Sequence, residues 1–136
     1  MNWKLIFQLS AFGLIMAFAT VSLIPQNVEP AFWIVIFIFC AYIIAKACNG
    51  KYFLQGLLVG LANSIWITAV HVFFRLSYLE HHPAFATWIY AHPPVSMHPR
   101  LSMIIVGPVS GLVFGVVLGL FAFIASKLVS KKVAVN

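Results

Sequence analysis

Hydrophobic residues occur along this chain in four long runs, separated by short segments that carry many of the polar residues. The runs cover residues 4–24, 31–48, 53–79 and 101–126. A helix crosses the hydrocarbon core of a bilayer with about 20 apolar residues, and each run is close to or above that length. The pattern therefore predicts an all-α fold, a four-helix transmembrane bundle, with residues 1–136 forming a single integral membrane domain.

Composition indicates the same class of protein. The chain is 63% hydrophobic and only 7% charged, whereas soluble domains carry roughly 25% charged residues. A soluble fold could not cover this much apolar surface with polar side chains. We therefore expect an integral membrane protein, located in the bacterial cytoplasmic (inner) membrane.

The placement of basic residues predicts the orientation of the bundle. One predicted membrane face carries six lysines: Lys4, Lys46, Lys51, Lys127, Lys131 and Lys132. The opposite face carries Arg75 and Arg100, together with the two acids, Glu29 and Glu80. Basic residues concentrate on the cytoplasmic side of membrane proteins. Both termini are therefore predicted to be cytoplasmic (N-in/C-in), and the histidine-containing loop between the third and fourth helices is predicted to face outward.

The net charge of +6 indicates membrane lipid rather than nucleic acid as a partner. Lysines at one membrane face favour anionic lipid headgroups. The basic residues form no extended patch interleaved with aromatic residues, which a nucleic-acid surface would need.

The first run has an alternative interpretation as a cleaved signal peptide. Lys4 provides a charged start, and Ala17 and Ala19 flank a position that resembles a small-residue cleavage site. The run continues to Ile24, beyond the usual length of a signal core, which favours a retained transmembrane helix.

Four glycines spaced by four residues mark the last run. They are Gly107, Gly111, Gly115 and Gly119, which we call the glycine stripe. Each step of four advances a helix by about 400°, so the stripe lies along one face. Small residues let helix backbones approach closely in lipid, where hydrophobic burial contributes little to association. We expect the stripe to pack on the first or third helix, with a contact to a second copy of the chain as the alternative.

The segment between the second and third runs is too short for anything but an antiparallel helical hairpin. It contains Asn49 and Gly50. Glycine commonly ends a helix in the left-handed conformation, and we expect Gly50 to do so.

Polar residues gather on one face of the third predicted helix. At about 100° per residue, an arc of about 140° holds Asn63, His71, Arg75 and Tyr78. Polar groups inside a membrane are costly, so this face must find polar partners or water. Two interpretations stay open: a pocket or half-channel open to the outside, or a network of hydrogen bonds between helices.

Depth distinguishes the members of this polar face. Asn63 is too deep to reach water and should hydrogen-bond to another helix. Arg75 lies near the outer end, where its long side chain can reach the headgroups. A contact between Glu29 and Arg75 would then tie the first connecting segment to the third helix.

The predicted outer loop holds four histidines, His81, His82, His92 and His98. Imidazole suits zinc, copper or nickel, so a transition-metal site is one hypothesis, with Met97 adding affinity for Cu(I). The spacing matches no established metal motif. Pro83 is well placed to start a short helix that covers the outer end of the bundle.

Enzyme chemistry finds little support in this sequence. Only two carboxylates are present, Glu29 and Glu80, and neither lies within any of the four runs. This argues against a paired acid–base site and against a proton-coupled exporter, which would want an embedded carboxylate. The leading interpretation is a small multi-pass accessory protein that binds lipid, other membrane proteins or a second copy of itself. The alternative is a small solute or ion conduit, metal-linked or not, that uses the polar face and the histidine loop.

Overall fold

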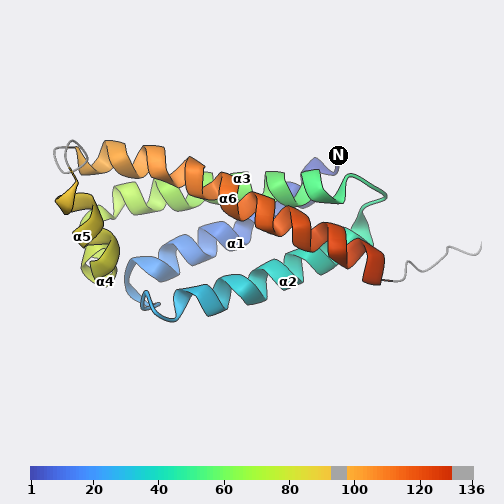
Figure 1. Cartoon of the computed structure of the whole chain (residues 1–136), viewed down its shortest axis with the longest axis horizontal. Coiled ribbons are helices and arrows are strands. Elements are labelled where there is room, and N and C mark those ends of the chain that lie inside the picture. Colours follow the sequence, from blue (N-terminus) through green and yellow to red (C-terminus); the bar gives the residue numbers. More distant parts are fainter. Residues whose placement is uncertain (93–97, 130–136) are drawn as a thin grey trace, which may run out of the picture.

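The computed structural model describes residues 1–92 and 98–129. Four of the helices formed by these residues are long and apolar enough to cross a membrane, and they lie side by side (Figure 1). The two short helices lie together at one end of the bundle (Figure 1). In chain order the six described helices are α1 (Trp3–Ser22), α2 (Glu29–Ala47), α3 (Tyr52–Phe73), α4 (Arg75–His81), α5 (Pro83–Ala91) and α6 (Pro99–Leu128).

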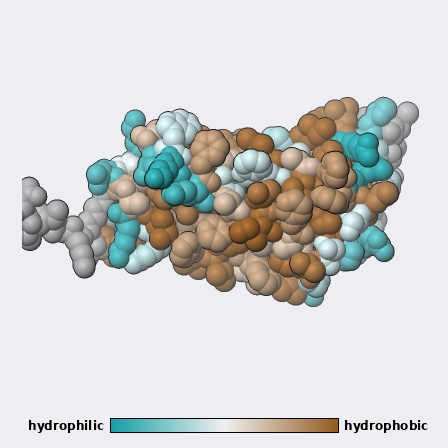
Figure 2. All heavy atoms as spheres, turned by 180° about the vertical axis from the view of Figure 1, so that it is seen from behind, coloured by the Kyte–Doolittle hydropathy of each residue, from teal (hydrophilic) through white to brown (hydrophobic). Residues whose placement is uncertain are grey.

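The surface of the bundle matches the apolar runs of the sequence. Figure 2 shows a broad hydrophobic band around the middle, with hydrophilic residues gathered at the two ends. The long helices expose large apolar side chains, among them Phe7, Ile15 and Val35. Four apolar helices of membrane-spanning length suggest an integral membrane protein.

Local chemistry explains where several helices begin. The side chain of Asn2 caps α1 by accepting a hydrogen bond of 3.1 Å from the backbone N–H of Leu5. Proline starts α5 and α6, where its missing N–H costs no helical hydrogen bond. Between α2 and α3 the left-handed residue is Lys51, at φ 53°, so the expectation for Gly50 is wrong.

The third apolar run does not form one helix, contrary to the prediction from the sequence. The helix breaks at Phe74, and α4 then turns across the end of the bundle. Two contacts hold α4 there: the Ser77 hydroxyl donates to the carbonyl oxygen of Val21 at 3.1 Å, and Leu79 packs in a small core with Ile89. The short helix expected to start at Pro83 is confirmed as α5.

Helices α3 and α6 pack closely because glycines of one helix face glycines of the other. A Cβ atom added at Gly56 would lie 2.7 Å from Cα of Gly119, and one added at Gly60 would overlap Gly115. Gly111 and Gly107 lie against Ser64 and Thr68 of α3 in the same way. The glycine stripe therefore lies along α3 of the same chain.

A solid apolar core fills the bundle toward the end where α2 connects to α3. It is made by side chains from all four long helices: Ile6, Leu9, Phe37, Cys40, Ala41, Ile44, Cys48, Val59, Leu118 and Ala122. From this end α2 and α6 diverge toward the end that holds α4 and α5 (Figure 1). We call these the α2–α3 end and the α4–α5 end.

Replacing Gly115 by alanine is expected to destabilise the fold. The added Cβ would lie 2.8 Å from the carbonyl oxygen of Leu57, which belongs to the backbone of α3 and cannot move independently. Overpacking of this kind costs about 1–3 kcal/mol, and the better helix propensity of alanine returns at most about 1 kcal/mol. The measurement is the midpoint of thermal unfolding in one detergent. Gly50→Ala is the matched control, since a Cβ there meets nothing within 4 Å; equal midpoints for both variants would contradict the packing argument.

Candidate functional site: a cavity between α2, α3 and α6

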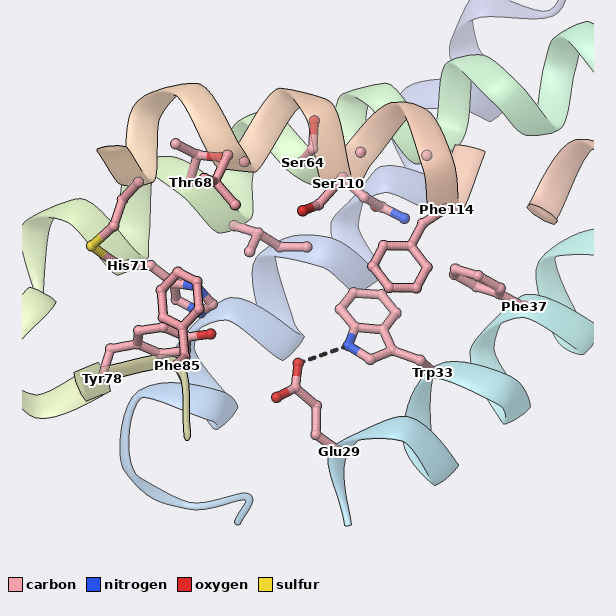
Figure 3. A pocket seen from close by; sticks show the side chains of 17 residues that line it. Glu29, Trp33, Phe37, Ser64, Thr68, His71, Tyr78, Phe85, Ser110 and Phe114 are labelled. Atoms are coloured by element: carbon pink, nitrogen blue, oxygen red, sulfur yellow. Dashed lines mark hydrogen bonds between the residues drawn. The ribbon is translucent and has the colours of Figure 1, made fainter. Parts of the chain in front are cut away.

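A cavity of about 260 Å³ lies between the diverging halves of α2 and α6, with α3 as its floor. Tyr78 of α4 and Phe85 of α5 close it at the α4–α5 end. In Figure 3, His71, Tyr78 and Phe85 lie on one side of the space, and Trp33, Phe37 and Phe114 lie on the other. The remaining lining residues are Glu29, Trp33 and Phe37 of α2, Gly60, Asn63, Ser64, Ile67, Thr68 and His71 of α3, and Met103, Val106, Gly107, Ser110, Gly111 and Phe114 of α6.

Asn63 presents an unsatisfied hydrogen-bond donor at the floor of the cavity. Its Oδ1 accepts a hydrogen bond of 3.2 Å from the backbone N–H of Gly13, and because that N–H can only donate, the two ends of the amide are assigned. The side chain is only 3% exposed, and its Nδ2 has no partner among the described residues. A buried donor without a partner costs about 1–3 kcal/mol, so a ligand or water that accepts from Nδ2 is favoured.

The carboxyl group of Glu29 forms the polar centre of the opposite wall. One oxygen, Oε1, accepts a hydrogen bond of 3.0 Å from the indole Nε1 of Trp33 (Figure 3). The other, Oε2, lies 3.0 Å from Nε2 of His82. The His82 side chain is 2% exposed and that of Glu29 is 21% exposed, so the pair is largely withdrawn from solvent.

The surroundings of His82 determine how many protons the pair holds. Its Nδ1 lies 3.0 Å from the backbone carbonyl oxygen of Tyr78, which only accepts, so Nδ1 carries a hydrogen. The contact between Nε2 and Glu29 then requires a second hydrogen, either on an imidazolium or on the carboxyl group. In both cases the pair has zero net charge and holds one proton more than a neutral imidazole beside a carboxylate.

The ring of Tyr78 stacks between two imidazoles, one of which belongs to this pair. The ring of Tyr78 lies 3.8 Å from that of His71 and 4.1 Å from that of His82, measured between centroids, with interplanar angles of 20° and 24°. Both faces of Tyr78 are therefore covered by imidazoles. Burial raises the pKa of the Tyr78 phenol above its usual range, with the charge of Glu29 as a second cause, so the group stays a neutral hydroxyl.

His71 is fixed from its other side by α1. The hydroxyl of Thr20 donates to the carbonyl oxygen of Met16 at 2.8 Å, so it accepts from Nε2 of His71, which lies 2.9 Å away. This contact assigns the hydrogen of His71 to Nε2. The floor and the end of the cavity are thus tied to α1 through Asn63 and His71.

The structure brings together three of the four residues of the predicted polar face. Asn63, His71 and Tyr78 line the cavity, although Tyr78 lies on α4 rather than on the third helix. Arg75 does not join them, because the break at Phe74 turns it toward the start of α6. The hypothesis of a contact between Glu29 and Arg75 is wrong, since Glu29 is occupied by His82 and Trp33.

Glu29 is the charged lining residue that the sequence did not predict. The sequence placed it in a connecting segment, but α2 begins at Glu29, with Pro30 in its first turn. The signal was available, because an acidic residue followed by proline is a common helix start. The prediction that Glu29 lies outside the helices of membrane-spanning length is therefore wrong.

The four histidines of the predicted metal site lie in different surroundings. Nδ1 of His81 and of His92 each lie 2.8 Å from a backbone carbonyl oxygen of their own helix, and both side chains are exposed. His82 faces Glu29, and His98 precedes α6. Within residues 1–92 and 98–129 no three potential ligands are grouped to hold a metal ion. Met97 lies outside the described residues, and a metal site stays a prediction.

Replacing Glu29 by alanine is expected to lower the midpoint of thermal unfolding more than replacing it by glutamine. Alanine leaves the half-buried Trp33 indole and the buried His82 without their partner, at a cost of about 1–3 kcal/mol for His82 and less for Trp33. Glutamine keeps an acceptor for the indole and offers a donor to Nε2 of a neutral imidazole. Glu80→Ala, at the exposed carboxylate of α4, is the control and should change little. An effect of Glu80→Ala as large as that of Glu29→Ala would contradict this assignment.

Comparisons with models of protein families, with curated proteins and with solved structures found no match for this chain. The features of the cavity that bear on function are its aromatic walls, the Glu29–His82 pair and Nδ2 of Asn63, which has no partner among the described residues.

Proposed function

We propose that this chain is a small multi-pass protein of the bacterial cytoplasmic membrane that binds a small amphipathic molecule in the cavity between α2, α3 and α6. The observation that carries the proposal is a cavity of about 260 Å³ that combines aromatic walls with the amide nitrogen of Asn63, whose side chain is 3% exposed and whose Nδ2 has no partner among the described residues. A packed bundle that served only to bind neighbours would need neither feature.

The size and lining of the cavity support an amphipathic ligand. An apolar cavity of about 150 Å³ in another protein takes up benzene, so this one has room for a ring with substituents. Trp33, Phe37, Phe85 and Phe114 offer apolar contacts, while Asn63 offers a hydrogen bond. Binding sites for small molecules combine apolar walls with a few fixed polar groups in this way.

The ends of the cavity favour a binding site over an open pore. The apolar core around Ile44, Val59 and Leu118 fills the bundle between the cavity and the α2–α3 end. A ligand would reach the site between α2 and α6, from the lipid, or from the α4–α5 end. A conduit would require the α3–α6 contact or this core to open, so transport is the second step of the proposal and binding is the first.

The proposed orientation is N-in/C-in. Among the described residues, Lys4, Lys46, Lys51 and Lys127 lie toward the α2–α3 end, and Arg75, Arg100 and the two acids lie toward the other. A lysine-rich end favours the cytoplasmic face. The cavity would then belong to the outer half of the membrane.

An accessory role is the second candidate. It is supported by the exposed apolar side chains of α1, α2 and α6, which suit lipid or the helices of another membrane protein. The two candidates differ in what blocks them: filling the cavity removes the first and leaves the second intact.

Ser110→Phe is expected to weaken ligand binding without unfolding the protein, since the new ring would occupy the cavity beside Phe114. The probe is para-fluorobenzyl alcohol, followed by fluorine NMR with the protein in lipid nanodiscs. We expect affinity to fall about tenfold or more, which corresponds to about 1.4 kcal/mol of lost binding free energy. Ser126→Phe, on the same helix but outside the cavity, is the matched control. Equal binding by both variants, or no binding by the unchanged protein, would contradict the proposal.

A further inference from the structure

We propose that the ligand of this cavity is an organic cation, and that its binding at Glu29 expels one proton from the Glu29–His82 pair. This inference rests on the proposed function, because it names the class of ligand for the same cavity. It goes further in assigning a charge to the ligand and a chemical consequence to its binding.

The charges around the cavity favour a cation. Glu29 is the one carboxylate among the described lining residues, and no lysine or arginine lines the cavity with it. The imidazole of His71 donates its Nε2 hydrogen to Thr20, so that proton is directed at α1 and away from Glu29. A ligand with a positive charge would therefore meet one acidic group and no fixed positive charge.

The aromatic walls of the cavity also suit an organic cation. A cation is attracted to the faces of aromatic rings, most strongly to tryptophan, and the attraction grows when both are removed from water. Trp33 is fixed beside the carboxyl group by its own hydrogen bond of 3.0 Å, and Phe85 closes the same end of the cavity. Tyr78 contributes its hydroxyl rather than its ring faces, which the two imidazoles cover.

The release of a proton follows from the contacts of His82. Before binding, the pair holds two hydrogens, one on Nδ1 and one shared between Nε2 and Oε2, and is neutral. When a cation settles against Glu29, keeping that second hydrogen would leave an unbalanced positive charge in an apolar site. Losing it breaks one N–H or O–H bond and leaves neutral His82 beside a carboxylate that is paired with the ligand. One positive charge enters and one proton leaves to water, so the charge of the site is unchanged.

Few other groups compete for this role. The titratable groups that face Glu29 are His82, His71 of α3 and Tyr78 of α4. The described cavity-lining residues of α5 and α6 include no titratable side chain, and α1 reaches the stack only through the hydroxyl of Thr20. His71 donates to that hydroxyl, and Tyr78 stays neutral. The Glu29–His82 pair is therefore the group that can release a proton when the ligand binds.

The test compares two probes of the same shape that differ only in charge. One is para-fluorobenzyltrimethylammonium, and the other is its neutral carbon analogue, para-fluoro-neopentylbenzene. Binding of each to the full chain in nanodiscs is followed by fluorine NMR, and proton release by an indicator dye in weak buffer. We expect the cation to bind with release of about one proton, so its affinity rises about tenfold for each pH unit over the range where the free pair holds that proton.

Glu29→Gln should abolish the proton release and lower the affinity for the cation about tenfold or more. Its binding of the neutral analogue should persist, which also shows that the variant is folded. Glu80→Gln is the matched control at the other carboxylate and should behave as the unchanged protein does.

The outcomes separate the inference from the proposed function. If the neutral analogue binds and the cation does not, or if the cation binds without proton release, the inference is wrong and the cavity remains a binding site. If neither probe binds the unchanged protein, the proposed function fails and the inference fails with it. Equal loss of both probes in Glu29→Gln, with the fold intact by circular dichroism, would also overturn the role of the charge.

Discussion

Where a helix bundle has an apolar outer surface, hydrophobic burial hardly favours contact between helices over contact with lipid. Close backbone contact then has to hold the helices together. In this protein that contact is the one between α3 and α6, where Gly56 and Gly60 meet Gly119 and Gly115. The apolar core lies beside it at the α2–α3 end. Because α2 and α6 diverge from that end, a cavity remains at the opposite end.

The polar groups of the chain are arranged around that space rather than scattered. Asn63 and His71 of α3 each use one polar atom to hold α1 in place. Oδ1 of Asn63 accepts a hydrogen bond from Gly13, and Nε2 of His71 donates one to Thr20. Glu29 and His82 join the start of α2 to the junction of α4 and α5. The same contacts that hold the helices in place therefore leave an amide donor and a proton-bearing pair at the surface of the cavity. A hydrogen-bond network between helices and a pocket are therefore not alternatives here.

The candidate site could be predicted only in part from the sequence. Asn63 and His71 were found because a helical period of 3.6 residues places them on one face, and that period holds within α3. Tyr78 lines the cavity from α4 and not as part of one long third helix. The helix ends at Phe73, and no glycine or proline there indicates the break. Glu29 was missed because periodicity within a helix says nothing about residues that a different helix brings to the same place.

The number and order of the apolar helices, and the approximate bounds of α1, α2 and α6, were determined by the sequence alone, because each follows from local composition along a continuous stretch of chain. The short helix at Pro83 was predictable for the same reason. The break at Phe74, the pairing of Glu29 with His82 and the position of Arg75 away from the cavity were decided by tertiary structure. Each depends on which helices pack together and how α4 crosses the end of the bundle, and contacts between residues about fifty positions apart leave no pattern in a single sequence.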